Sequence, residues 1–98
     1  MQHAQFELSR DPVETTEVTA VKSYKFDPQV IAVSAGSEVT WTNEDDFPHN
    51  LQVLDGSDAT HDLPIGDSVR LTFDEAGDYY YECSIHPQQM RGKVVVTN

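Results

Sequence analysis

The 98-residue sequence has little of several features that would otherwise define a function class. Cys83 is its single cysteine, so no disulfide can form within the chain and cysteine pairing does not indicate a redox compartment. Only 6 basic residues stand against 17 acidic ones, and the net charge of -11 argues against a nucleic-acid partner, which needs a basic surface. No apolar run approaches the roughly 18 residues of a membrane span, and residues 1–10 do not have the pattern of a signal peptide. We therefore expect neither segment in this chain.

Short runs of alternating apolar and polar residues predict an all-β fold. No window has a sustained helical period, and all 5 prolines lie between the runs. We predict a two-sheet β-sandwich of seven or eight strands, formed by one domain over residues 1–98, with residues 1–17 as an N-terminal edge strand and polar loop. A polar loop is expected over residues 55–67. The predicted strands lie at about 18–22, 30–33, 39–42, 49–54, 69–74, 79–83 and 92–97.

Three side chains with affinity for copper occur within eight residues of one another, near the C-terminus. Cys83 ends a predicted strand, and His86 and Met90 follow it in a loop before the last strand. His49 begins another strand and can supply a fourth donor from the same end of the sandwich. Two histidines, one cysteine and a weak axial methionine form the trigonal copper site that is used for electron transfer. The sequence therefore predicts one copper ion bound by these four residues.

A polar residue directly follows each of two predicted ligands. Asn50 comes after His49, and Ser84 comes after Cys83. We expect Asn50 and Ser84 to hydrogen-bond to each other and to hold the two ligand segments together, with the Asn50 backbone N–H directed at the sulfur. Hydrogen bonds of this kind orient ligands and tune a metal.

With these motifs, the chain resembles the type 1 blue-copper proteins (cupredoxins), and most closely amicyanin within the plastocyanin and pseudoazurin group. The resemblance implies a Greek-key sandwich and a mononuclear copper, with His49, Cys83 and His86 in the trigonal plane and Met90 axial. In one respect the pattern differs: three residues separate His86 from Met90, against two in amicyanins and four in plastocyanins. The segments that carry the resemblance are residues 36–43, 48–50, 71–83, 86–87 and 90–96.

The resemblance also implies how such a protein works. The exposed edge of His86 is expected to be the electron port, set in a small apolar docking patch formed by Phe47, Pro48, Ile85 and Pro87. We expect a monomeric, non-enzymatic, periplasmic or extracytoplasmic protein with redox protein partners of the cytochrome or dehydrogenase type. The acidic surface suits a basic partner, although solubility or adaptation to high salt explains the same charge.

Two other interpretations use the same residues. A copper carrier would bind the ion for delivery without redox cycling. A copper oxidase or nitrite reductase would need further histidines for a second copper centre, and only His3 and His61 remain. We expect His61 to be a solvated loop residue. Met1, Gln2 and His3 would form a square-planar Cu(II) site at a free amino terminus, which we expect to be adventitious.

Overall fold

In the computed structural model, which describes residues 11–22, 24–55, 59–85 and 90–98, the chain forms strands joined by turns. No helix within these ranges is long and apolar enough to cross a bilayer. The strands are β1 (Val13–Glu14), β2 (Glu17–Val21), β3 (Lys25–Asp27), β4 (Val30–Ser34), β5 (Ser37–Asn43), β6 (His49–Val53), β7 (Thr60–Leu63), β8 (Ser68–Phe73), β9 (Gly77–Glu82) and β10 (Arg91–Thr97).

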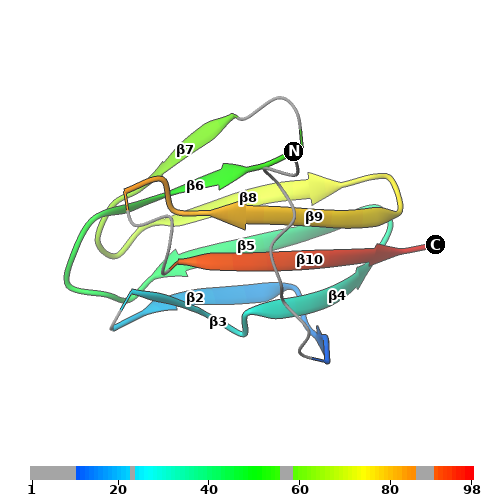
Figure 1. The fold of residues 1–98 in the computed structure, drawn as a ribbon, viewed down its shortest axis with the longest axis horizontal. Helices are drawn as coiled ribbons and strands as arrows, with labels where there is room; N and C mark the ends of the chain where they lie inside the picture. The colour runs from blue at the N-terminus through cyan, green and yellow to red at the C-terminus, as the bar shows by residue number, and fades with distance from the viewer. Residues whose placement is uncertain (1–10, 23, 56–58, 86–89) are drawn as a thin grey trace, which may run out of the picture.

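The strands form two sheets that pack face to face (Figure 1). One sheet has the order β1-β4-β10-β9-β6-β7, and the other has the order β3-β2-β5-β8. Strand β5 pairs with β8 in one sheet, and the next strand along the chain, β6, pairs with β7 and β9 in the other. The predicted Greek-key β-sandwich is therefore confirmed.

The structure has ten strands within the described residues, against the seven or eight predicted. Two short strands, β3 and β7, lie outside every predicted strand, and the short β1 lies at a sheet edge within residues 1–17, where an N-terminal edge strand and polar loop were predicted. Strand β7 corrects the predicted loop over residues 55–67, and it places His61 in a strand instead of a loop. These strands bury at most one side chain each, so their sequences have little of the alternation that predicts a strand. The assignment of residues 1–98 to one domain stays a prediction.

The core lies between the sheets and is built from the inward-facing residues of the longer strands. In β5 these residues are Val39, Trp41 and Asn43, and in β10 they include Val94 and Val96. The alternation also runs through β9 and beyond, because Tyr81 and Cys83 are both buried. Burial of apolar area of this kind supplies most of the favourable free energy of folding.

Gly92 is required by the close approach of β10 to a core ring. A Cβ atom at this position would overlap the Cζ and Oη atoms of Tyr81. The Tyr81 ring in turn lies edge-on to Trp41, with 5.3 Å between ring centroids. Any larger residue at position 92 would therefore displace the central aromatic group of the core.

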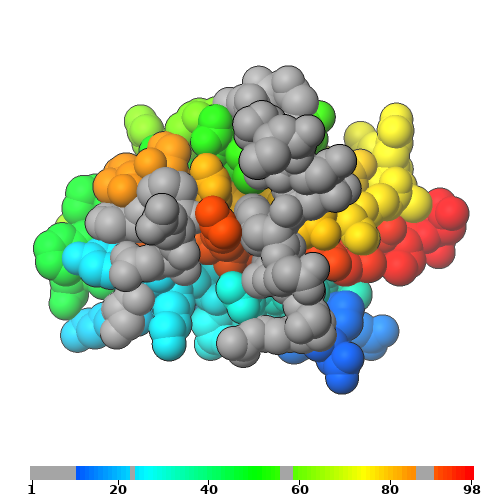
Figure 2. Space-filling model, in the orientation of Figure 1, coloured from blue at the N-terminus to red at the C-terminus, as the bar shows by residue number. Residues whose placement is uncertain are grey.

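Three connections between strands meet at one end of the sandwich, on the left in Figure 1: β5–β6, β7–β8 and the segment that follows β9. In the space-filling view the β5–β6 connection, in green, forms the outer surface of this end (Figure 2). The β7–β8 connection is bonded to the end of β5, because Gly66 donates to the Asn43 carbonyl (3.0 Å) and Asn43 donates to the Asp67 carbonyl (2.9 Å). The predicted ligands that the structure describes belong to this end.

Candidate functional site

His49 begins β6, Cys83 directly follows the neighbouring antiparallel strand β9, and both side chains are buried in the same core. Strand β6 pairs with β9 so that Val53 is opposite Tyr81. Inward-facing residues alternate along β6, which directs His49 inward together with Leu51 and Val53. His49 is 3% exposed and Cys83 is fully buried. The distance from His49 Nδ1 to Cys83 Sγ is 3.7 Å.

That separation fits two ligands of one metal ion. A thiolate sulfur at about 2.3 Å and an imidazole nitrogen at about 2.0 Å from one first-row metal, at an angle of about 110–120°, lie about 3.5–3.7 Å apart. A thiolate and an imidazole are also the donor types that copper prefers. The two residues therefore fit a copper ion in both chemistry and spacing.

Met90 is the third predicted ligand that the structure describes. It is fully buried, and its carbonyl accepts a hydrogen bond from the Cys83 N–H at 2.9 Å. This bond connects the two ends of the segment between β9 and β10, one end at Cys83 and the other at Met90. His86 and Pro87 lie outside the described residues, and so does His3. In the described part of the chain, no three His, Cys, Asp or Glu side chains gather as a metal cluster.

The predicted contact between Asn50 and Ser84 is present in the structure. Asn50 Nδ2 donates to Ser84 Oγ at 2.7 Å, and the Ser84 N–H donates to Asn50 Oδ1 at 2.7 Å. The two residues lie 34 positions apart in the sequence, each directly after a predicted ligand. This pair of bonds therefore fastens the end of β9 to the start of β6 beside the site.

A carboxylate that the sequence did not single out contacts the predicted ligand His49. Asp45 Oδ2 lies 2.8 Å from His49 Nε2, and Asp45 is only 4% exposed. Asn43 holds the loop between them: its Oδ1 accepts the Asp45 N–H at 2.8 Å, and its Nδ2 donates to the carbonyls of Phe47 (2.9 Å) and Leu63 (3.0 Å). The only signal in the sequence is an acidic residue four positions before the histidine, in a chain with 17 acidic residues.

Two carboxyl groups near the site have shifted pKa values. Burial is the largest single influence on the pKa of Asp45 and raises it, but the hydrogen bonds from His49 and the Asp46 N–H, together with nearby positive charge that includes Lys22, leave the pKa below its usual value. Burial raises the pKa of Glu82, and the charge of Arg91, 4.0 Å away, opposes that shift. The Asp45 carboxyl is therefore ionised at neutral pH.

The predicted docking patch is exposed where the structure describes it. Phe47 and Ile85 are 52% and 53% exposed, and Pro48 is exposed as well. Sequence reasoning missed Tyr24, whose ring lies 5.6 Å from the Phe47 ring and 6.0 Å, edge-on, from the His49 ring. The Tyr24 ring therefore connects the exposed Phe47 ring to the buried histidine.

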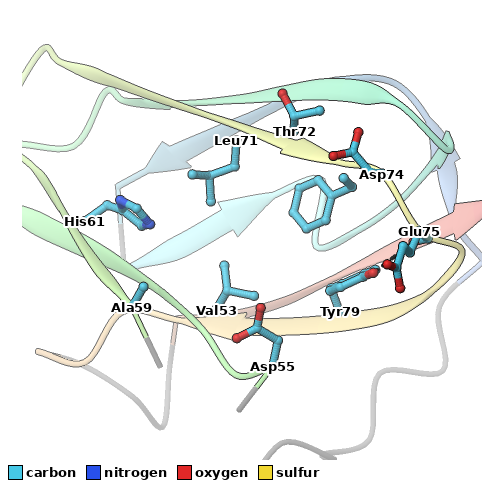
Figure 3. A pocket seen from close by; sticks show the side chains of 10 residues that line it. Val53, Asp55, Ala59, His61, Leu71, Thr72, Asp74, Glu75 and Tyr79 are labelled. Carbon is cyan, nitrogen blue, oxygen red and sulfur yellow. Dashed lines mark hydrogen bonds between the residues drawn. The ribbon is translucent and has the colours of Figure 1, made fainter. Parts of the chain in front are cut away.

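His61 lies apart from these residues, in a pocket of about 260 Å³ between β6, β7 and β8 and the turn before β9 (Figure 3). It is half-buried and lies opposite Leu51 in the sheet, so the predicted solvated loop position is wrong. Among the described residues, the side chains that line the pocket are mainly apolar groups and carboxylates, with His61 as the one histidine. Its lining residues are Val53, Asp55, Ala59, His61, Leu71, Thr72, Phe73, Asp74, Glu75 and Tyr79.

Comparison with known proteins places this arrangement among copper proteins. Residues 13–97 match a family described as copper binding proteins, plastocyanin/azurin family. Amicyanin-alpha from Methylorubrum extorquens is 38% identical over 90 residues, which cover 87% of this chain and 74% of the relative. A purple cupredoxin from Nitrosopumilus maritimus superposes with a TM-score of 0.73 at 29% identity, covering 85% of this chain and all of that one. A copper-containing nitrite reductase from Thermus scotoductus has the same TM-score at 31% identity, over 91% of this chain but 23% of the enzyme.

Proposed function

Because this chain belongs to the plastocyanin/azurin family of copper-binding proteins, we propose that it carries single electrons between redox proteins. One copper ion, held by His49, Cys83, His86 and Met90, would supply the one-electron couple. The observation that carries the proposal is the 3.7 Å separation of the buried His49 Nδ1 and Cys83 Sγ atoms, which suits two ligands of one ion.

The chain's own residues favour electron transfer because they hold the donors in one geometry. His49 is the first residue of a paired strand, Cys83 follows another, and two 2.7 Å hydrogen bonds between Asn50 and Ser84 join them. The bond from the Cys83 N–H to the Met90 carbonyl restrains the third donor's backbone. A site held by a packed scaffold reorganises little when its charge changes, and fast electron exchange requires this.

We further propose that electrons enter and leave through His86, within an apolar docking patch of Phe47, Pro48, Ile85 and Pro87. The exposure of Phe47 and Ile85 supports this role, since isolated patches of this kind suit brief encounters with a small interface. The net charge of -11 favours a basic partner through long-range attraction. The protein is expected to act as a monomeric carrier in the periplasm or another extracytoplasmic compartment, and not as an enzyme.

The test is to add Cu(II) to the metal-free protein and record the visible spectrum. An intense thiolate-to-copper absorption band, followed by reversible one-electron voltammetry, is the expected result. Cys83→Ser should abolish the band, whereas Ile85→Ala, an exposed neighbour of the cysteine, should leave it unchanged. Fluorescence of Trp41, the single tryptophan, checks that each variant is folded.

Other outcomes assign other functions. A colourless protein that binds only Cu(I) would indicate a copper carrier and would contradict the proposal. Catalytic turnover of nitrite or oxygen by the copper-loaded protein alone would favour the enzyme interpretation. An unchanged band in Cys83→Ser would show that the metal is bound elsewhere.

A further inference from the structure

The β5–β6 connection carries a buried carboxylate that contacts the side chain of a predicted copper ligand. Asp45 Oδ2 and His49 Nε2 are 2.8 Å apart, and the two side chains are 3% and 0% exposed. The neighbouring Asp46 is different: its side chain is 71% exposed and lies 3.5 Å from the Lys22 Nζ atom. Two adjacent aspartates in one loop therefore have opposite surroundings.

Two hydrogen bonds hold Asp45 in place, one with the Asn43 side chain and one with the backbone N–H of Asp46. The Asp46 N–H donates to Asp45 Oδ1 at 2.7 Å, and the Asp45 N–H donates to Asn43 Oδ1 at 2.8 Å. Asn43 is 1% exposed and is itself bonded to the Leu63 carbonyl of β7. This leaves one carboxylate oxygen, Oδ2, directed at the histidine.

The contact determines which imidazole nitrogen can bind a metal. An ionised carboxylate only accepts hydrogen bonds, so His49 Nε2 must carry the proton. Neutral imidazole has one proton, and Nδ1 is then left with a free lone pair. Nδ1 is the atom that faces Cys83 Sγ at 3.7 Å. The carboxylate thus selects the tautomer that the copper site needs.

We propose that Asp45 is a positioning residue of the copper site, one that holds His49 in the Nε2–H tautomer and uses its buried charge to stabilise the oxidised over the reduced metal. This inference rests on the proposed function. The ion carries one more positive charge in the oxidised state, and a fixed negative charge nearby favours that state and lowers the reduction potential. Loss of such a ligand partner typically costs about 10- to 100-fold in metal affinity.

Asp45→Asn removes the charge and keeps one acceptor: its amide oxygen can still accept the Nε2–H bond, while its NH2 group takes the place of the oxygen that accepts the Asp46 N–H. We expect the tautomer to persist in Asp45→Asn, with Cu(II) affinity about 10- to 100-fold lower. If Cu(I) affinity is unchanged, the midpoint potential rises by about 60–120 mV at 59 mV per tenfold change. Asp45→Ala removes both charge and acceptor and should also mix the tautomers. Asp46→Asn is the matched control, because it makes the same change in net charge at an exposed site.

The first measurement uses the metal-free full chain, where nitrogen NMR shifts of His49 report the tautomer. Competition titration and voltammetry then give copper affinity and potential. An Nδ1–H tautomer in the wild-type protein, or equal potentials in Asp45→Asn and Asp46→Asn, would overturn the inference. Because the tautomer is read without copper, a wild-type protein that shows no thiolate-to-copper band would contradict the proposed function alone.

Discussion

Asn43 offers a stringent test of the network beneath the site, because one buried amide serves three backbone groups. Its Nδ2 donates to the Leu63 and Phe47 carbonyls, and its Oδ1 accepts the Asp45 N–H. Asn43→Ala removes all three bonds. The Phe47 carbonyl belongs to an exposed loop and can be rehydrated, but Leu63 and Asp45 are buried, so their groups lose partners that water does not replace.

The expected cost follows from those two groups. An unsatisfied buried donor or acceptor costs about 1–3 kcal/mol, so Asn43→Ala, which leaves two such groups, should lower the free energy of unfolding by roughly 2–6 kcal/mol. Domains of this size are stable by about 5–15 kcal/mol, so a loss over most of that range leaves the variant folded. Asn43→Asp keeps the shape and the acceptor but cannot donate a hydrogen bond, so it should be at least as unstable as Asn43→Ala.

The assay is urea unfolding of the metal-free protein, followed by the fluorescence of the buried Trp41. Thr42→Ala is the matched control, since Thr42 lies one residue away and loses only an exposed 2.9 Å bond to Ser68 Oγ. We expect it to cost about 0.5–1 kcal/mol. A loss in Asn43→Ala no larger than in Thr42→Ala would refute the role assigned to the amide.

Three further predictions concern the core and the site. Gly92→Ala should destabilise the protein by about 3 kcal/mol in the same assay, because its Cβ would overlap the Tyr81 ring. The control is Gly36→Ala, which has open space around it at a φ of +92° and should cost only about 1–2 kcal/mol. Asn50→Ala should cost more than Ser84→Ala, since it removes both hydrogen bonds of the pair and the serine variant removes one; equal losses would contradict this. Met90→Leu should change the reduction potential more than copper affinity, as expected of a weak axial ligand, and an unchanged potential by voltammetry would exclude that role.

The sequence predicted the parts of the fold in which one strand face is buried. Val39 and Trp41, or Val94 and Val96, alternate with outward-facing residues, and this alternation also gave the inward direction of Cys83. The additional strands were missed for the opposite reason. Strand β7 buries only Leu63, so nothing in its polar sequence distinguishes it from a loop until β6 is present to pair with it.

The same distinction applies to the site. Asn50 and Ser84 could be predicted because each is adjacent to a candidate ligand in the sequence. Asp45 and Tyr24 could not, since their contacts with His49 depend on how two connections fold over the end of the sandwich. A polar residue directly after a candidate ligand predicts a contact beside the site. Asp45 is one of 17 acidic residues and lies four positions before His49, so its place in the sequence predicts no contact.

Asn43 explains why the missed residue is nevertheless held firmly. Asn43 is the last residue of β5, and the alternation of the strand directs its side chain into the core. From there it binds β7 through the Leu63 carbonyl and the loop through Asp45 and Phe47. The buried Asn43 amide thus links the sheets to the backbone of Asp45, whose carboxylate contacts His49, and to the backbone of Phe47, whose ring is exposed. Displacement of Asn43 should therefore disturb the predicted ligand His49 and the docking patch together.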